Sequence, residues 1–166
     1  AAGCETASVK KEPTYEAAAR HPFIPANHAA AQALLAQLHA RSATRQPVIV
    51  ATIVNVDALD RSSTLGRMVS EQIAARFAQD GHRVVEMKFR NDVYMLRDQG
   101  ELMLSREIRD IADSHDARIV IVGTYGSSSD FVFINLKAID PSTNVALATH
   151  DYALPLDQDN RALLRG

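Results

Sequence analysis

Apolar positions in the first half of the chain recur first at helical and then at strand spacing. One predicted helix face consists of Ala31, Leu34, Leu35 and Leu38. Asn27 precedes them, and asparagine is a residue type whose side chain caps helix starts well. The segment "PVIVATIVNVD" follows as a nearly continuous β-branched run, which is typical of a strand covered on both faces. We therefore expect a helix that begins at Asn27, followed by a central strand over residues 48–54.

The next stretch predicts a second helix, an edge strand and a third helix. "SSTLGRMVSEQIAARFAQDG" has apolar residues at helical spacing, and Gly81 is placed to take the left-handed conformation that ends helices. "HRVVEMKFR" alternates apolar and charged residues, as a half-exposed strand at a sheet edge does. Ser105 can cap a further helix that buries Ile108, before a second buried strand in "RIVIVGTYG".

After Tyr125 the pattern becomes that of consecutive strands. The turn signals "GSSSD" and "PSTN" separate three predicted strands, and "DQDNRALL" indicates a short terminal helix. The order of these elements predicts a single-domain α/β fold with a mixed sheet. In that fold two βα crossovers are followed by an antiparallel three-strand meander, and the helices lie mainly on one face.

Composition and charge narrow the classes of function. The chain has 166 residues, 46% of them hydrophobic, which is enough for one core without disulfides. Its net charge of −2 comes from mixed charges and argues against a nucleic-acid partner. Residues 5–26 combine prolines with mixed charges, so we expect residues 1–26 to hold a flexible tether and residues 27–166 to form the domain. No stretch is apolar enough to span a bilayer, so any membrane attachment would need a lipid or another protein.

The candidate catalytic and metal-binding residues lack the neighbouring motifs that such sites require. Asp57 and Asp60 follow the central strand, where ligand crevices form, but turn and helix-start roles are simpler for both. The six histidines are scattered without a pair four residues apart on one helix, so we expect no metal site. Residues 127–129 with His150 and Asp151 supply the residue types of a hydrolase triad, yet no nucleophile-elbow motif holds the serines. The sequence therefore predicts neither an enzyme nor a cofactor.

The first residues, "AAGC", resemble the end of the lipobox of bacterial lipoproteins, whose cysteine becomes the lipid-modified first residue of the mature protein. Small residues precede Cys4, which is the only cysteine, and a proline-containing tether follows it. Leucine is usual where Ala1 stands. The alternative is an expression remnant beside a free cysteine. We expect Cys4 to carry a lipid.

Two passages give a more specific indication. "VNVDALDRSSTLGR", and "GELMLSREIR" followed by a strand that ends in "VGTY", resemble the FlgO family of flagellar outer-membrane lipoproteins, and the resemblance covers most of residues 23–164. It implies a non-enzymatic role at the periplasmic face of the outer membrane of a Gram-negative bacterium. The implied partners are flagellar basal-body or other outer-membrane-associated proteins, and self-association also stays open. The architecture is similar to that of the N-terminal domain of TolB.

Two other functions remain open at this point. One is a general envelope assembly or secretion factor that shares the fold. The other is an envelope enzyme or a periplasmic solute-binding domain that uses a crevice near Asn55, Asp57 and Thr124, at the end of the central strand.

The segment "RNDVYMLRDQGELM" is the candidate surface for partner contact. It shows neither strand alternation nor a sustained helical stripe, and it contains the residue types enriched at protein interfaces. The predicted contact residues are Arg90, Tyr94, Met95 and Arg97. The alternative is a loop whose apolar residues pack beneath the sheet.

Overall fold

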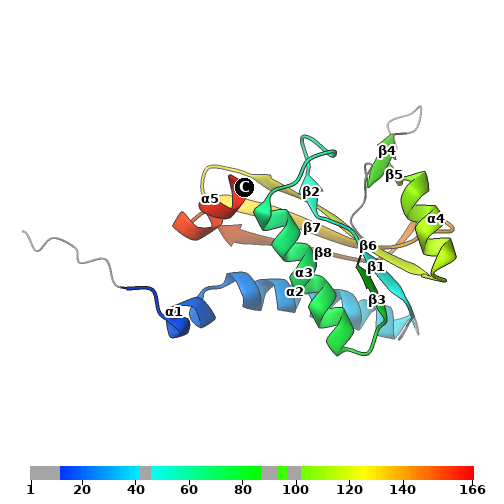
Figure 1. The fold of residues 1–166 in the computed structure, drawn as a ribbon, viewed down its shortest axis with the longest axis horizontal. Coiled ribbons are helices and arrows are strands. Elements are labelled where there is room, and N and C mark those ends of the chain that lie inside the picture. The colour runs from blue at the N-terminus through cyan, green and yellow to red at the C-terminus, as the bar shows by residue number, and fades with distance from the viewer. Residues whose placement is uncertain (1–11, 42–45, 87–92, 97–101) are drawn as a thin grey trace, which may run out of the picture.

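The computed structural model describes residues 12–41, 46–86, 93–96 and 102–166 (Figure 1). Within these ranges lie the helices α1 Tyr15–Arg20, α2 Phe23–Ala40, α3 Thr64–Gln79, α4 Arg106–Ser114 and α5 Gln158–Leu164. The strands are β1 Val48–Val50, β2 Val54–Asn55, β3 Val84–Glu86, β4 Tyr94–Leu96, β5 Leu102–Leu104, β6 Ile119–Ser127, β7 Phe131–Asp140 and β8 Val145–Pro155.

Six strands form one sheet, and it is mixed, as the sequence predicts. Their order is β3-β1-β6-β7-β8, and β2 pairs with β6 beyond the end of β1. Strand β1 is parallel to β3 and β6, whereas β6, β7 and β8 form an antiparallel meander. The edge position predicted for the segment around Val84 is confirmed by β3, which pairs with β1. Strands β4 and β5 form a separate antiparallel pair.

The helices lie mainly on one face of the sheet, and α4 is the exception. On the first face α2 and α3 bury a large apolar cluster that includes Leu34, Phe77 and Leu136. On the second face α4 and the β4–β5 pair bury a smaller cluster that includes Leu104 and Ile108. The second face has less helical cover, because α4 lies at one end of the molecule's long axis (Figure 1).

The predicted start of the first long helix is wrong. Helix α2 begins at Phe23 after Pro22, and Asn27 lies within the helix, fully buried, rather than at its cap. Phe23 is only 6% exposed, so burial of an apolar residue extends the helix toward the N-terminus. Pro25 is compatible with this start because N–H groups in the first helical turn have no intrahelical partner. The short helix α1, capped by the Thr14 hydroxyl, also lies in the segment predicted as a tether.

The predicted helix caps inside the domain are confirmed. The Ser105 hydroxyl accepts a hydrogen bond from the N–H of Ile108, and Ser63 caps α3 in the same way. Gly81 has a positive φ of 99° just after α3, as its position predicts.

The run from Val48 to Val54 is broken into β1 and β2. Between them the Ile53 N–H donates to the Ser70 hydroxyl at 2.9 Å, and the Ile53 carbonyl accepts from the Ser62 hydroxyl at 2.6 Å. Side chains in α3 and in the loop before it thus replace strand partners at this point. After the interruption β2 pairs with β6 beyond the end of β1.

Candidate functional site

Two neighbouring hollows lie over β6 and β7. The larger has a volume of about 700 Å³, and its lining includes Val56, Asp57, Thr124, Phe133, Asn135 and Asp151. The smaller has a volume of about 220 Å³ and is lined by Val56, Leu59, Tyr94, Thr124, Asn135, Lys137, Ile139, Asn144 and Ala146. We call the two hollows together the sheet groove, because they share Val56, Thr124 and Asn135.

Strand alternation places the side chains of the sheet groove. Successive side chains on β7 point to opposite faces, so Phe133, Asn135 and Lys137 share one face while Ile134 and Leu136 enter the core under α2. The turn after β2 supplies the wall: the Val56 N–H donates to the Tyr125 carbonyl at 2.9 Å. The groove is therefore built on the sheet and fixed by its hydrogen bonds.

The crevice predicted near Asn55, Asp57 and Thr124 corresponds to the larger hollow in part. Asp57 and Thr124 line it. Asn55 does not, because its side-chain oxygen accepts a hydrogen bond from the Asp57 N–H at 2.8 Å and so shapes the turn.

The sheet groove combines exposed apolar side chains with a polar centre. Phe133 is 55% exposed and Val56 50% exposed, and the Phe131 ring lies 6.2 Å from that of Phe133. Asn135 and Asp151 line the same hollow, and the Asn135 amide donates to the Asp151 carboxylate at 2.7 Å. Exposed aromatic rings beside fixed polar groups are typical of surfaces that bind other proteins.

The candidate contact segment borders this groove. Tyr94 lines the smaller hollow and packs partly against the second core cluster, and burial raises the pKa of its phenol to about 12. Val93 next to it is buried, which fits the alternative that apolar residues of the segment pack beneath the sheet. Met95 lies in β4, whereas Arg90 and Arg97, like Cys4, lie outside the described residues.

The residue types of a hydrolase triad are not assembled. His150 and Asp151 are consecutive on β8, so their side chains point to opposite faces. Asp151 accepts from Asn135, and the Ser128 hydroxyl donates to the Phe131 carbonyl. Each of these polar groups has a structural role in a strand or turn.

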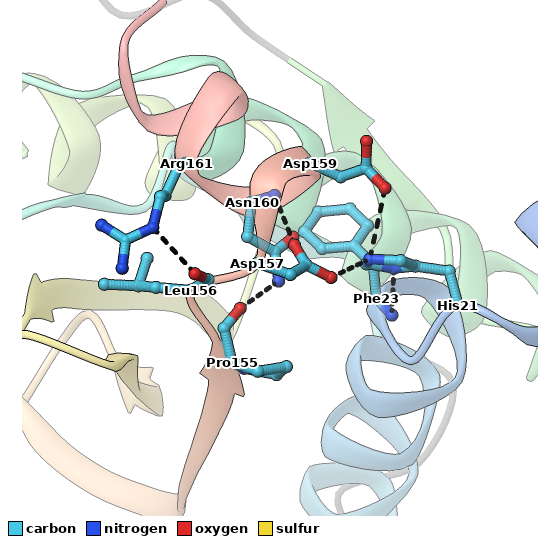
Figure 2. A network of polar contacts seen from close by, with 8 residues as sticks. All are labelled: His21, Phe23, Pro155, Leu156, Asp157, Asp159, Asn160 and Arg161. Carbon is cyan, nitrogen blue, oxygen red and sulfur yellow. Dashed lines mark hydrogen bonds and ion pairs between the residues drawn. The ribbon is translucent and has the colours of Figure 1, made fainter. Parts of the chain in front are cut away.

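Two groups of histidine and aspartate that the sequence did not indicate are brought together by the fold. In the first, the Phe23 N–H donates to His21 Nδ1 at 3.2 Å, which leaves the ring proton on Nε2 to be donated to Asp157 at 2.7 Å (Figure 2). Asp159 lies 3.8 Å from the same nitrogen. The second group is His39, Asp80 and His82. Each group joins a histidine of one segment to residues far along the chain, His39 to Asp80 and His82, and His21 to Asp157 and Asp159, so no local motif could reveal them.

The first group joins the start of α2 to α5. Asp157 caps α5 by accepting from the Asn160 N–H at 2.8 Å (Figure 2). Partial burial by itself raises the pKa of the Asp157 carboxyl. The hydrogen bonds from Asn160 and His21 lower this pKa by more than burial raises it, so the pKa lies below its usual value.

Comparisons with known proteins decide the family. The family model described as FlgO protein matches residues 28–159. This chain belongs to the FlgO family. The FlgO match spans all strands of the sheet and the whole sheet groove, and it excludes Cys4. No curated protein sequence matches the chain.

Solved structures show a related fold for this FlgO-family chain. The LpoB C-terminal domain from Escherichia coli has a TM-score of 0.52 and 12% identity, and the similarity covers 77% of this chain and 97% of that one. The LpoB C-terminal domain from Salmonella enterica has a TM-score of 0.50 and 13% identity, with coverage of 75% and 94%. At this identity the likeness concerns the α/β fold alone. No helix among the described residues has the length and apolar character needed to cross a membrane.

Proposed function

We propose that this FlgO-family protein is a non-enzymatic outer-membrane lipoprotein that supports flagellar assembly, stability or motility through protein contacts at the periplasmic face. The observation that carries the proposal is the FlgO match over residues 28–159. Of the triad candidates, Ser128 and Asp151 make structural hydrogen bonds instead, and His150 lies on the opposite face of β8 from Asp151, which agrees with a function in binding rather than in catalysis.

The sheet groove is the proposed contact surface. Its rim offers Phe133 and Val56 to a partner, and its centre offers polar groups that are already oriented by hydrogen bonds. The proposed partner is a protein of the flagellar basal body or another outer-membrane-associated protein. The segment with Arg90, Tyr94, Met95 and Arg97 would extend this contact beyond Tyr94, which lines the groove.

An anchor at Cys4 would hold the domain at the membrane. Helix α1 lies at one end of the long axis, and α4 with the β4–β5 pair lies at the other (Figure 1). The β6–β7 turn, near Phe133, lies toward the α1 end, because the Leu156 N–H donates to the Asp130 carbonyl and the neighbouring Asp157 contacts His21.

The test is Phe133→Ser in the full-length gene of the source bacterium. Phe133 is mostly exposed, so we expect the melting temperature and protein level to stay near those of the parent while swimming or flagellar retention decreases. The matched control is Ile24→Ser, which removes a 48% exposed apolar side chain from α2, away from the groove. Normal motility in the Phe133 variant would exclude the groove, and normal motility after gene deletion would exclude the flagellar role.

One observation favours a second candidate, a periplasmic solute-binding domain. The larger hollow lies within the range of about 300–1,000 Å³ found for small-molecule sites, and Asp57 and Thr124 line it. A general envelope assembly or secretion factor is the third candidate. Deleting the gene in a strain without flagella separates these two candidates from the flagellar role. Loss of a solute-binding domain or of an envelope factor should still cause an uptake or envelope defect in that strain, whereas loss of a purely flagellar protein should not.

A further inference from the structure

His39, Asp80 and His82 meet where α2 and α3 end. His39 Nε2 lies 2.9 Å from Asp80 Oδ2, and His82 Nε2 lies 3.6 Å from the same oxygen. All three candidate ligand atoms lie within 4.8 Å of one another. This arrangement of two imidazoles and one carboxylate is independent of the sheet groove and of the proposed flagellar role.

His82 has an unsatisfied nitrogen that points into this group. Its side chain is fully buried, and Nε2 has no hydrogen-bond partner among the described residues. His82 Nδ1 lies 3.0 Å from the Gln46 carbonyl, which can only accept, so Nδ1 carries a proton. In the neutral ring Nε2 then presents a lone pair toward the Asp80 carboxylate. A positive charge between these two electron-rich atoms would stabilise the arrangement.

The backbone holds Asp80 and His82 in place. The His82 N–H donates to the Phe77 carbonyl and the Gly81 N–H to the Ala78 carbonyl, the two bonds of a Schellman motif. The Phe77 ring packs at 5.4 Å from the His82 ring. Gly81, with its positive φ, lets the chain reverse so that the residues on either side of it face His39.

The local field also favours a cation. His39 lies in the last turn of α2, and Asp80 is the C-cap of α3. The C-terminal end of a helix carries partial negative charge from its unsatisfied carbonyl groups. Two such ends and one carboxylate therefore meet at this point.

The group around His21 has no imidazole nitrogen without a partner. In the His21 ring Nδ1 accepts from the Phe23 N–H, and Nε2 donates to Asp157 (Figure 2). A metal would have to displace the Nε2 proton and the hydrogen bond to Asp157, as it would also at His39, whose Nε2 lies 2.9 Å from Asp80. Unlike the group of His39, Asp80 and His82, however, the His21 group has no imidazole nitrogen that lacks a partner. The two groups are thus distinguished by the hydrogen bond on the second ring nitrogen, which for His82 leaves Nε2 free to act as a ligand.

We propose that His39 Nε2, His82 Nε2 and an Asp80 carboxylate oxygen bind a divalent transition-metal ion, with zinc as the best fit. Imidazole nitrogen and carboxylate oxygen are zinc ligands, and three protein ligands leave one position for water. His39 is 42% exposed, so the metal would reach the site from solvent. The Gln46 carbonyl supplies the outer contact that fixes the His82 ring.

The test is calorimetric titration of the untagged full chain with zinc chloride. It is done in a Cys4→Ser background, because a free thiol would also bind zinc. The parent is expected to bind one zinc ion at this site, and His39→Ala to bind it more than about tenfold more weakly. His39 is chosen because its exposure lets the variant fold. His28→Ala, also in α2 but outside the group, is the matched control and should bind as the parent does.

A second readout is the visible spectrum of the same proteins with cobalt(II), which develops ligand-field bands when it replaces zinc at a protein site. These bands should appear in the parent and in His28→Ala and be lost in His39→Ala. Absence of zinc binding in the parent, or equal binding by His39→Ala, would overturn the proposal.

Discussion

Asn27 shows how one buried side chain can join three elements. Its amide nitrogen donates to the Gln72 side chain in α3 at 2.8 Å, and its oxygen accepts from the Tyr152 hydroxyl in β8 at 2.5 Å. Burial holds the pKa of the Tyr152 phenol above its usual value, so the hydroxyl keeps the proton that it donates. The same residue type at a helix cap would have satisfied a single N–H group.

Removing this amide should therefore destabilise the fold. We expect Asn27→Ala to lower the free energy of unfolding by about 1–3 kcal/mol, because two partly buried partners lose their hydrogen bonds to a fully buried amide. Chemical denaturation of Asn27→Ala, Tyr152→Phe and the double variant measures the coupling. Strictly additive effects of the two substitutions would contradict a direct interaction.

Asp157 gives the fold a pH dependence. Its folded-state pKa lies below the ordinary value, so its charge adds stability above about pH 4, and this stability is lost as the pH falls through the lower folded-state pKa. We expect Asp157→Asn, which can still cap α5, to be less stable than the parent at about pH 5 and to approach it at about pH 2. Denaturation curves at both pH values measure this.

The control for this prediction is Asp159→Asn. It makes the same chemical change beside the same imidazole, but the Asp159 side chain is 79% exposed, so little effect is expected. If the parent and Asp157→Asn differed in stability by the same amount at both pH values, the pH dependence could not be assigned to the Asp157 charge.

At the scale of elements, α2 covers the free edge of β8. The Gln37 side chain donates to the Thr149 carbonyl at 2.8 Å and accepts from the Thr149 N–H at 3.1 Å. One glutamine thus satisfies both backbone groups of Thr149, which the strand edge would otherwise offer to another chain.

We expect Gln37→Ala to increase self-association through β8, since this edge would again present an unpaired donor and acceptor. Light scattering at rising protein concentration measures the effect. Gln32→Ala is the control because Gln32 lies on the same helix and its side chain accepts a hydrogen bond from Arg76 in α3 rather than bonding to β8. Equal association by the two variants would show that the edge needs no such cover.

The elements with sustained periodicity could be predicted from the sequence, and the others could not. Helix α3 and the β6–β8 meander follow from local spacing and turn residues. The break after β1 depends on Ser70, which reaches Ile53 only after α3 has packed. Strands β4 and β5 have three residues each, too few for alternation to be visible.

For the candidate sites too, residues next to a recognisable element could be predicted from the sequence, and residues brought together by packing could not. Asp57 could be placed at a crevice because it directly follows a strand, whereas Phe133 on the far wall is contributed by a strand much later in the chain. His39 and Asp80, separated by 41 positions, meet only through packing of α2 on α3, so the absence of a local histidine motif gave no sign of a shared site.

At the scale of the whole molecule, the proposed function depends on where the domain is held. We expect Cys4→Ser in the full-length precursor to release the protein from the outer membrane, because the acyl chains, which bind bilayers with about 0.8 kcal/mol per buried CH₂, would then be missing. Membrane fractionation and the intact mass of the parent and variant measure this. A variant that still fractionates with the outer membrane, and whose mass differs from that of the parent only by the substitution, would contradict lipidation.

Strand β6 pairs with β1 and β2 on one side and with β7 on the other, so it belongs to both halves of the sheet. The β6–β7 and β7–β8 connections are tight turns, whereas β1 and β3 reach their places only after a helix has crossed the sheet. Short loops close faster than long crossovers, so the meander can assemble first and offer β6 as a template on which β1 and then β3 add. The last strand to join would be β3, whose amides should exchange their hydrogens soonest in the native protein.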